Sequence, residues 1–375
     1  MSTHPPPAGA AWPRPLRRVG VFRALMLGDL LCATPALRAL AAAWPGAQIT
    51  LIGLPWAEPL ARRLASVHRF EPFPGHPGLP ERVPDLRAWP GFVARMRRRR
   101  FDLLVQLHGS GGIVNALLDG LGAAGTAGFV ETAAQVDATH AAWPREGHEI
   151  ERLLGLVDWL KIGRQGVALD FPLGDEDRAA LQRQVPEWSP DAAYVCVHPG
   201  AQLPSRRWPP QHFAAVADWL QAQGLRVVLT GTAAERPLTQ AVQAGMRSPA
   251  LDLAGRTSLF TLGALVERAR LVVCNDTGVS HVAAALRVPS LVVSAGSDVG
   301  RWAPLDRHLH QVLWRDLACR PCAHVVCPYG HECATGVTPA EAVERLRAWP
   351  GLSAAAAAPA RRAAAGEAAP RPPAW

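Results

Sequence analysis

Short runs of β-branched and other apolar residues alternate along this chain with longer segments whose apolar positions recur every three or four residues. The first pattern is typical of buried strands and the second of helices. Their alternation predicts parallel sheets covered by helices on both faces. The expected strands are 18–25, 48–54, 101–107, 192–198, 225–230, 271–274 and 290–294, and the expected helices are 30–44, 89–100, 113–121, 146–160, 210–223, 234–246, 259–268 and 279–286.

Glycine and proline punctuate residues 163–190, which we interpret as a linker between two α/β halves of similar size. We expect two doubly wound, Rossmann-like domains, 16–165 and 166–350, each long enough to bury its own core. Residues 1–15 and 351–375 are rich in proline and alanine and lack a periodic apolar face, which predicts disordered tails. Ligands of doubly wound sheets bind at the carboxyl ends of strands, so we expect the two domains to face each other across a cleft that holds the active site.

The chain is basic, and its positive charge is unevenly distributed. The 375 residues have a net charge of +8, and part of it is concentrated in Arg95 and in the arginine run 97–100. Such a run is typical of the C-terminal turn of a helix, where cations are favoured. Attraction to an anionic membrane surface or an acidic acceptor is the functional alternative. Nucleic acid is not an expected partner, because no nucleic-acid-binding motif or interleaved aromatic residues accompany the arginines.

The apolar stretch 19–37 is interrupted by Arg23 and Asp29. Charges near the middle of a membrane span are unfavourable, so this stretch predicts a core strand and helix rather than a span. The segment after Arg17 and Arg18 is similar to the start of a secretion signal, but the same two charges interrupt its apolar region. We therefore expect a cytoplasmic protein.

One strand-to-helix turn carries a concentration of small polar residues. An apolar run at 271–274 breaks at Asn275-Asp276-Thr277-Gly278 and resumes as an alanine-rich helical pattern that includes His281. A helix start of this kind presents free backbone N–H groups and a positive dipole end, which suit a phosphate or diphosphate. The alternative is an ordinary helix start with Asp276 as its N-cap.

Two further turns have a similar character. Gly28 allows a tight turn after the first strand, and Asp29 follows it as a candidate general base or as the N-cap of a helix that begins at Leu30. In the turn 198–209, Gly200 is followed by Arg206 and Arg207 before a helix that begins at Pro210. A glycine-containing loop with two arginines suits an anionic ligand.

Five stretches containing these turns occur in the order of a known family: 27–38, 198–201 with 206–209, 230–235, 253–259 and 275–281. By these stretches the chain resembles glycosyltransferase family 9, whose members include the ADP-heptose:lipopolysaccharide heptosyltransferases. The resemblance spans roughly residues 18–305. It implies a GT-B fold, in which the N-terminal domain binds the acceptor and the C-terminal domain binds a nucleotide-sugar.

The resemblance also implies roles for individual residues. Asp29 would be the base that deprotonates the acceptor hydroxyl, and Arg38, at the end of the same stretch, is expected to bind the acceptor. The remaining candidates are expected to bind the donor. Glu235 would contact the ribose, and either Arg206 or Arg207 would face the diphosphate. The full set of expected donor-binding residues is Gly200, Arg206, Arg207, Glu235, Asp276, Thr277, Gly278 and His281.

The implied reaction is inverting transfer of a heptose, or a related sugar, from an ADP-sugar to a lipid-linked lipopolysaccharide inner-core acceptor. Asp29 supplies a base, and helix N-termini at Gly278 and Gly200 with an arginine stabilise the leaving diphosphate, so no metal ion or other cofactor is expected in catalysis. Peripheral contact with the cytoplasmic face of the inner membrane is a further expectation. Two alternatives stay open. One is a basic protein that binds an anionic polymer or membrane, and the other is a sugar epimerase or dehydrogenase, although the first turn lacks G-x-G-x-x-G.

Four of the seven cysteines form a cluster late in the chain: Cys319, Cys322, Cys327 and Cys333, with His324 and His331 between them. Four thiolates in a short loop suit a structural zinc ion, and the spacing is also compatible with an iron–sulfur site. Thiols without metal, or disulfides in the isolated protein, are the other possibilities. The remaining three, Cys32, Cys196 and Cys274, fall in core elements and are predicted to be small buried side chains.

Overall fold

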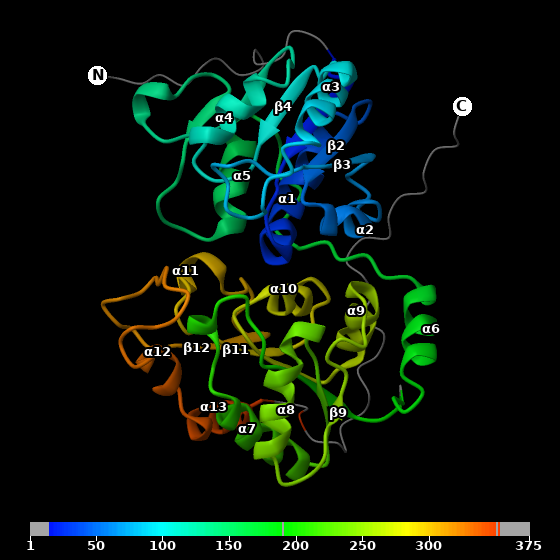
Figure 1. Ribbon diagram of the computed structural model, residues 1–375, viewed down its shortest axis with the longest axis vertical. Coiled ribbons are helices and arrows are strands. Elements are labelled where there is room, and N and C mark those ends of the chain that lie inside the picture. Colours follow the sequence, from blue (N-terminus) through cyan, green and yellow to red (C-terminus); the bar gives the residue numbers. More distant parts are fainter. Residues whose placement is uncertain (1–14, 190, 350–351, 353–375) are drawn as a thin grey trace. The chain divides into compact units, whose positions relative to one another are not determined.

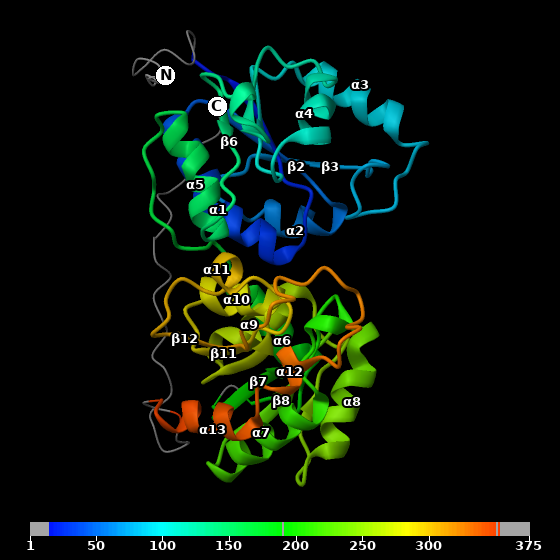
Figure 2. The ribbon, with the colours of Figure 1, turned by 90° about the vertical axis from the view of Figure 1, so that its left-hand side faces the viewer.

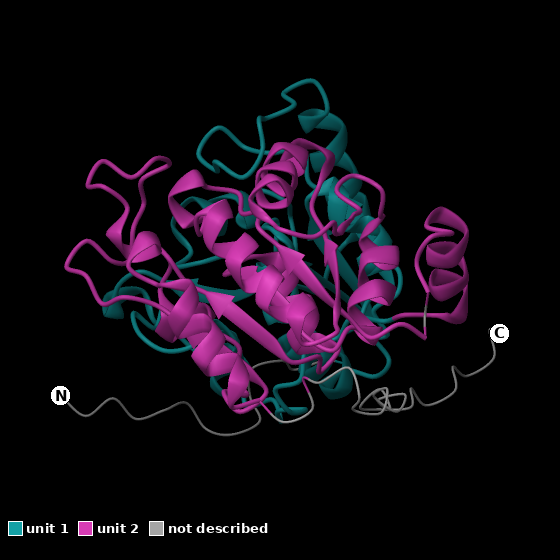
Figure 3. Cartoon of the chain, turned by 90° about the horizontal axis from the view of Figure 1, so that it is seen from below, with its two compact units in different colours: residues 1–172, 368–375 teal, residues 173–367 magenta. Residues whose placement is uncertain are grey.

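The computed structural model describes residues 15–189, 191–349 and 352. The predicted tails 1–15 and 351–375 therefore lie outside the described residues, apart from Pro15 and Leu352. The chain divides into two compact units, which Figure 3 distinguishes by colour. Unit 1 extends to Pro172 and unit 2 begins at Leu173. This division falls inside the segment interpreted as a linker.

Unit 1 alternates strands and helices. In chain order its elements are β1 (Arg18–Phe22), α1 (Leu27–Ala43), β2 (Gln48–Gly53), the 3-10 turn η1 (Pro55–Ala57), α2 (Glu58–Ala61), β3 (Arg69–Pro72), α3 (Trp89–Arg99), β4 (Leu103–Gln106), α4 (Gly112–Asp119), β5 (Thr126–Val130), η2 (Ala133–Gln135), β6 (His140–Ala142) and α5 (Glu149–Trp159).

The strands of unit 1 form one parallel sheet in the order β3-β2-β1-β4-β5-β6. Helices α1 and α5 pack against each other on one face, and α3 and α4 cover the other (Figures 1 and 2). On the α3 and α4 face, Phe22, Phe92 and Leu104 belong to one buried apolar cluster. A parallel sheet covered on both faces needs continuous apolar strands, which is why β1 and β4 were visible in the sequence.

Unit 2 repeats this plan. In chain order its elements are α6 (Asp175–Gln184), β7 (Tyr194–His198), η3 (Pro204–Arg206), α7 (Pro210–Ala222), β8 (Arg226–Leu229), η4 (Ala233–Glu235), α8 (Arg236–Gly245), β9 (Leu251–Asp252), α9 (Leu259–Arg268), β10 (Val272–Asn275), α10 (Gly278–Ala285), β11 (Ser290–Val293), α11 (Val299–Trp302), β12 (His310–Leu313), α12 (Glu332–Thr335) and α13 (Pro339–Arg347).

The sheet of unit 2 is also parallel, in the order β12-β11-β10-β7-β8-β9. Helices α7, α8 and α13 lie on one face, and α9 and α10 lie on the other (Figure 1). Numbered within each unit, both sheets have the strand order 3-2-1-4-5-6. The strand order reverses beside the first strand of each unit, between β1 and β4 and between β7 and β10.

Each strand expected from the sequence is present, but five short strands were missed: β3, β5, β6, β9 and β12. They have two to five residues, and four of them form the outer edges of the sheets, where partial burial permits polar residues such as Arg69 and Gln311. The linker interpretation missed α6, whose first turn contains the acidic residues 175–177. The arginine run is confirmed as the last turn of α3.

Within the part of the chain that the structure describes, no helix is both long enough and apolar enough to cross a membrane. Cys32, Cys196 and Cys274 are fully buried, as predicted. Burial raises the pKa of the Cys196 and Cys274 thiols, which keeps them protonated at ordinary pH.

Candidate active site

The predicted site residues gather where doubly wound sheets bind ligands, at the carboxyl ends of strands beside the reversal of strand order. In unit 1, Asp29 follows β1. In unit 2, Gly200 follows β7 and Asp276 follows β10, the two strands on either side of the reversal. Glu235 follows β8, the neighbour of β7. The topology of each sheet thus explains why these turns carry polar residues.

Asp29 is the third residue of α1 and not its N-cap. The helix begins at Leu27, and Met26 occupies the capping position without a side-chain hydrogen bond, so the predicted capping role was wrong. The Asp29 side chain is 23% exposed. Its place in the first turn favours a negative charge, because the N-terminal end of the helix dipole is positive. Asp29 is therefore an accessible carboxylate in the first turn of the helix that follows β1.

A buried arginine fixes the position of Asp29. Arg23 Nη2 lies 3.8 Å from Asp29 Oδ1, and its Nε and Nη2 donate hydrogen bonds to the Asp29 carbonyl at 3.1 and 3.0 Å. Arg23 is itself 1% exposed and forms an ion pair with Glu149 at 3.0 Å. A cation inside an apolar run is a sequence signal for a buried ion pair, but the link from Arg23 to Asp29 and Glu149 depends on the fold.

A histidine follows β4, across the reversal of strand order from Asp29 in the same sheet. His108 is 7% exposed, and its Nδ1 accepts a hydrogen bond from the Ala24 N–H at 3.3 Å. Its Nε2 lies 3.5 Å from Glu81 Oε1. Burial alone would raise the pKa of Glu81, but the hydrogen bond and charge of His108 lower it overall. Sequence reasoning missed both residues, since nothing local distinguishes them.

The Asp276 turn of unit 2 is held by a serine from the next strand-to-helix connection. Asp276 is 9% exposed and its Oδ2 accepts a hydrogen bond from Ser297 Oγ. Ser297 Oγ lies 2.8 Å from Ser294 Oγ. The N-cap of α10 is Thr277, whose side chain makes no capping bond, so the predicted capping role of Asp276 was also wrong. The Asp276 carboxylate instead ties two neighbouring turns together.

Arg320 supports this arrangement from the cysteine-rich segment, residues 319–333. Its guanidinium donates hydrogen bonds to the carbonyl oxygens of Ser294 at 2.9 Å and Ser297 at 2.6 Å, and to Ser294 Oγ at 3.2 Å. Burial lowers the pKa of Arg320, while nearby anionic groups, including Asp276, act in the opposite direction. Arg320 thus brings positive charge to the Asp276 turn.

The buried side chain of Asn275 joins the Asp276 turn to the loop after β7. Asn275 Oδ1 accepts a hydrogen bond from the Trp208 N–H at 2.9 Å, and its Nδ2 donates to the carbonyls of Pro199 and Gly200 at 2.8 and 3.2 Å. Asn275 is fully buried. The two turns predicted to bind the donor are therefore brought together in the structure.

Glu235 lies directly against Gly200. A Cβ added at Gly200 would collide with the Glu235 carboxylate, which explains why glycine is required there. Glu235 Oε2 accepts hydrogen bonds from the Thr232 N–H and Oγ1 at 2.8 and 2.9 Å. Nearby, burial lowers the pKa of His198, and the charge of Glu235 opposes this shift. His198 Nδ1 lies 3.1 Å from Thr230 Oγ1, so a hydrogen bond holds the buried ring in place.

The two candidate arginines differ in their partners. Arg207 Nε donates a hydrogen bond to the Ala201 carbonyl at 2.9 Å. Arg206 Nε is buried and has no hydrogen-bond partner among the described residues. A buried donor without a partner is unfavourable and uncommon in folded proteins. The two arginines are thus distinguished at Nε, which is bonded in Arg207 and lacks a partner in Arg206.

His281 and Arg38 have less open surroundings. His281 lies in the first turn of α10, is 5% exposed, and packs edge-on against Trp302 with ring centres 6.4 Å apart. Arg38 Nη1 forms an ion pair with Asp170 at 2.6 Å, and its other nitrogens donate to the Gln165 and Ala168 carbonyls. Burial raises the pKa of Asp170 despite the charge of Arg38. The acceptor-binding role of Arg38 stays a prediction.

The cysteine-rich segment acts in this structure as a scaffold for the donor turns. Ser205, beside Arg206, donates its N–H to the Val325 carbonyl at 3.0 Å and its Oγ to the His324 carbonyl at 2.5 Å. The Cys322 N–H donates to the Gly296 carbonyl at 2.7 Å. The segment therefore contacts both the Arg206 loop and the loop that holds Asp276.

The four clustered cysteines are free thiols, from exposed Cys319 to buried Cys333. Among residues 15–189, 191–349 and 352, no group of three or more histidine, cysteine, aspartate or glutamate side chains is arranged to hold a metal ion. The placement of these described side chains does not fit a metal ion.

Comparison with known proteins agrees with this geometry. The sequence profile of glycosyltransferase family 9 (heptosyltransferase) matches residues 91–332, well over half of the 375 residues. Lipopolysaccharide heptosyltransferase 1 of Pseudomonas aeruginosa is similar at 27% identity, over 83% of this chain and 88% of its own. Lipopolysaccharide heptosyltransferase 2 of Salmonella typhimurium is also 27% identical, over 75% of this chain and 83% of its own.

A solved structure extends the likeness to the fold. The structure of E. coli ADP-heptose lipopolysaccharide heptosyltransferase II matches with a TM-score of 0.70 at 22% identity, over 89% of this chain and 98% of its own. The shared fold is GT-B, with two doubly wound parallel sheets as described above. The fold class expected from the sequence is confirmed.

Proposed function

The chain belongs to glycosyltransferase family 9 and is a glycosyltransferase, and from this premise we propose that it transfers a heptose, with inversion, from an ADP-sugar to a lipopolysaccharide inner-core acceptor. Two relatives named lipopolysaccharide heptosyltransferases, which it matches over most of their length, support this choice of sugar and acceptor. The E. coli protein of similar fold is named for ADP-heptose, which supports the choice of donor. The observation that carries the proposal is the joining of the two donor turns by the buried side chain of Asn275, with the unpartnered Nε of Arg206 in the loop after β7.

The donor would bind at the joined turns of unit 2. The first N–H groups of α10, at Gly278 and Val279, lack acceptors within the helix and suit the diphosphate. Arg206 Nε would donate to the same group, which satisfies its missing hydrogen bond. Glu235 Oε1 makes no hydrogen bond among the described residues and would accept one from a ribose hydroxyl.

The transfer step needs a base and a stabilised leaving group. Asp29 would take the proton of the acceptor hydroxyl as that oxygen forms a bond to the anomeric carbon. The bond between this carbon and the diphosphate breaks at the same time, and its electron pair leaves with ADP. Because attack comes from the face opposite the leaving group, the configuration inverts. Arg206 and the start of α10 stabilise the negative charge that develops on the diphosphate.

A direct transfer assay tests this function. Purified protein is incubated with ADP-heptose and a lipopolysaccharide precursor that lacks heptose, and the product is analysed by mass spectrometry and by NMR of the anomeric configuration. One added heptose with inverted configuration supports the proposal. A parallel thermal-shift screen of ADP-, UDP- and GDP-sugars identifies the donor, and stabilisation by another nucleotide alone would contradict the choice of ADP.

We place the reaction at the cytoplasmic face of the inner membrane, where a lipid-linked acceptor would be met. The basic surface of unit 1 supports peripheral contact there. Fractionation of cells at low and at moderate salt tests it: protein that leaves the membrane fraction as salt rises is held electrostatically. Protein that stays in the soluble fraction at low salt contradicts the membrane contact.

A structural metal at the four clustered cysteines stays a separate prediction. The N–H groups of His324 and Tyr329 donate to the sulfurs of Cys322 and Cys327 at 3.4 Å, and N–H donors to sulfur of this kind are compatible with metal-bound cysteines. Metal analysis of anaerobically purified protein decides it, with the Cys319→Ser and Cys322→Ser variants for comparison. Absence of stoichiometric metal from the wild-type protein contradicts the prediction.

A further inference from the structure

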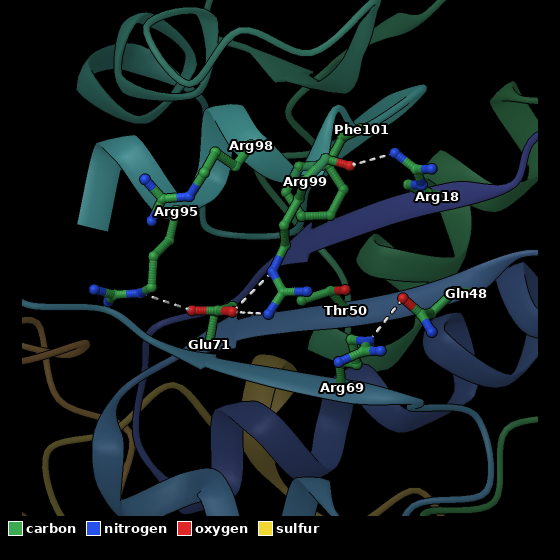
Figure 4. A pocket seen from close by; sticks show the side chains of 9 residues that line it. All are labelled: Arg18, Gln48, Thr50, Arg69, Glu71, Arg95, Arg98, Arg99 and Phe101. Carbon is green, nitrogen blue, oxygen red and sulfur yellow. Dashed lines mark hydrogen bonds and ion pairs between the residues drawn. The ribbon is translucent and has the colours of Figure 1, made fainter. Parts of the chain in front are cut away.

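Unit 1 contains an open pocket of about 360 Å³ that belongs to neither predicted ligand site. Its walls come from the starts of β1, β2 and β3 and from the last turns of α3 (Figure 4). Charged side chains dominate this lining: Arg18, Arg69, Arg95, Arg98, Arg99 and Glu71. The pocket therefore carries five guanidinium groups and a single carboxylate.

The single carboxylate accounts for only two of the arginines. Glu71 is 4% exposed, and its oxygens accept hydrogen bonds from Arg95 Nε at 3.4 Å and from Arg99. These ion pairs fix the wall of the pocket between β3 and α3 (Figure 4). A buried carboxylate with two guanidinium partners is stable only while it stays paired, so Arg95 and Arg99 are structural.

The other three arginines have no carboxylate partner within the described residues. Arg69 Nε donates to Gln48 Oε1 at 2.7 Å, and Arg18 Nη1 donates to the Arg99 carbonyl at 3.0 Å. The Arg98 side chain makes no hydrogen bond or ion pair with any described residue. Their donors and charges remain available in a concave site, where positive potentials add and are focused by the surrounding protein.

The pocket is separated from the proposed catalytic residue of the same unit. It opens at the amino ends of the strands, whereas Asp29 follows the carboxyl end of β1. Along the five residues of β1 the two ends are about 13 Å apart, at about 3.3 Å per residue. A small ligand in the pocket would not touch Asp29.

We propose that this pocket binds a phosphate-bearing anion, such as a phosphate ester or a diphosphate. The planar guanidinium group donates two parallel hydrogen bonds to phosphate oxygens, and a cluster of such groups is the usual protein partner of this anion. The headgroup of an anionic membrane lipid and a soluble phosphate compound both present this group. The chemistry is the same in both cases, and it does not depend on which sugar the enzyme transfers.

The test variant is Arg69→Gln with Arg98→Gln. Both side chains are exposed and neither pairs with a carboxylate, so the double variant should fold normally. Arg95 and Arg99 are left intact, because their removal would strand the buried Glu71. The matched control is Arg87→Gln with Arg145→Gln. It removes the same charge from exposed positions of unit 1 that do not line the pocket.

Two binding measurements distinguish the sources of the phosphate. Inorganic diphosphate is titrated calorimetrically, with excess ADP present so that any nucleotide site is already filled. Vesicles of phosphatidylcholine, with and without phosphatidylglycerol, are used in a flotation assay at fixed ionic strength. We expect the affinity of the test variant for diphosphate and for anionic vesicles to fall roughly tenfold or more, because each arginine contributes to binding near an anionic surface. The affinity of the control should change far less.

Binding of the wild-type protein to phosphatidylglycerol vesicles, with competition by diphosphate, assigns the pocket to a lipid headgroup. Binding to diphosphate without vesicle binding assigns it to a soluble phosphate compound. The proposal is overturned if neither binds, if the test variant binds as well as wild type, or if the control loses as much. These assays do not measure sugar transfer, so a negative result leaves the proposed function intact. A negative result in the transfer assay likewise leaves the proposed phosphate pocket intact.

Discussion

The first turn of unit 1 and the Asp276 turn of unit 2 place an aspartate at equivalent points of two similar sheets, yet the two carboxylates differ in their surroundings. The Asp29 side chain is 23% exposed and forms an ion pair with the Arg23 guanidinium at 3.8 Å. Asp276 is 9% exposed and accepts a hydrogen bond from Ser297 Oγ. An accessible carboxylate suits proton transfer, whereas a buried and hydrogen-bonded one suits holding a loop in shape. Similar sequence patterns after a strand thus serve different purposes.

The same contrast extends to the histidines beside these turns. His108 in unit 1 faces Glu81 at 3.5 Å, and the pair lowers the pKa of Glu81 against the effect of burial. His198 in unit 2 is bonded to a threonine hydroxyl, and burial lowers its pKa. Unit 1 therefore presents charged groups at its reversal of strand order. Unit 2 presents a buried histidine there, together with the carboxylates of Asp276 and Glu235 and the guanidinium of Arg320.

The largest effect should come from Asp29→Asn. The amide keeps the shape of the side chain but cannot take a proton, so we expect the transfer rate to fall roughly a thousandfold. ADP affinity should stay unchanged, because Asp29 lies in unit 1 and acts on the acceptor. Steady-state kinetics and calorimetry measure the two quantities. The control Asp119→Asn alters an exposed carboxylate of unit 1, and a near wild-type rate for Asp29→Asn would leave Asp29 with only an electrostatic role in α1.

The next largest effects are expected from substitutions of the adjacent residues Arg206 and Arg207. Arg206→Met should weaken ADP binding roughly tenfold to a hundredfold, the contribution of a hydrogen bond to a charged group. It should not lower the free energy of unfolding of the ligand-free protein, because it removes a buried nitrogen that has no partner. Arg207→Met should do the opposite, with a smaller loss of affinity and a loss of stability of about 1 kcal/mol from its bond to Ala201.

Calorimetry with ADP and urea unfolding measure both quantities for each variant. Equal losses of affinity in the two variants would show that the missing partner of Arg206 does not identify the ligand-facing residue. A large loss of stability for Arg206→Met would show that its guanidinium has a structural partner instead.

Asp276→Ala should have a mixed effect. It leaves Ser297 Oγ without its acceptor and loosens the turn, so we expect the free energy of unfolding to fall by about 1–3 kcal/mol, together with weaker ADP binding. Ser297→Ala should reproduce part of both effects, because it removes the same hydrogen bond from the other side. If Ser297→Ala leaves ADP affinity and stability at wild-type values, the hydrogen bond does not hold the turn.

The sequence indicated the places of these turns better than the roles of their residues. The apolar run before Asn275 and the alanine-rich pattern after Gly278 are local signals, and they located β10 and α10 to within a residue. The capping role of Asp276 was wrong because its partner Ser297 lies 21 residues away and meets it only in the folded sheet. The same holds for Asn275, whose contacts reach Trp208.

The choice between Arg206 and Arg207 also depended on the fold. The two residues are adjacent and identical, so no local pattern separates them. The structure does so through the Ala201 carbonyl, which Arg207 reaches. Arg320 was missed for a related reason, because three of its acceptor groups lie on a loop more than twenty residues earlier in the chain.

The smallest effect is expected from the pH dependence of stability that the buried His198 ring contributes. Burial holds the pKa of His198 below its ordinary 6.5, with Glu235 acting in the opposite direction. On acidification the unfolded chain therefore takes up a proton near pH 6.5, before the folded protein does. The stability contributed by the neutral ring is complete above pH 6.5 and is lost as the pH falls towards the folded pKa, by up to about 1.4 kcal/mol per pH unit.

Urea unfolding at about pH 7.5 and about pH 5.5 measures this loss. We expect His198→Gln to show a shallower dependence on pH than wild type, since glutamine does not titrate. His308→Gln is the matched control, because His308 is exposed and should leave the wild-type dependence unchanged. If His198→Gln keeps the full wild-type loss, the acid sensitivity arises elsewhere. The contrast between the two units would then rest on the different surroundings of Asp29 and Asp276 alone.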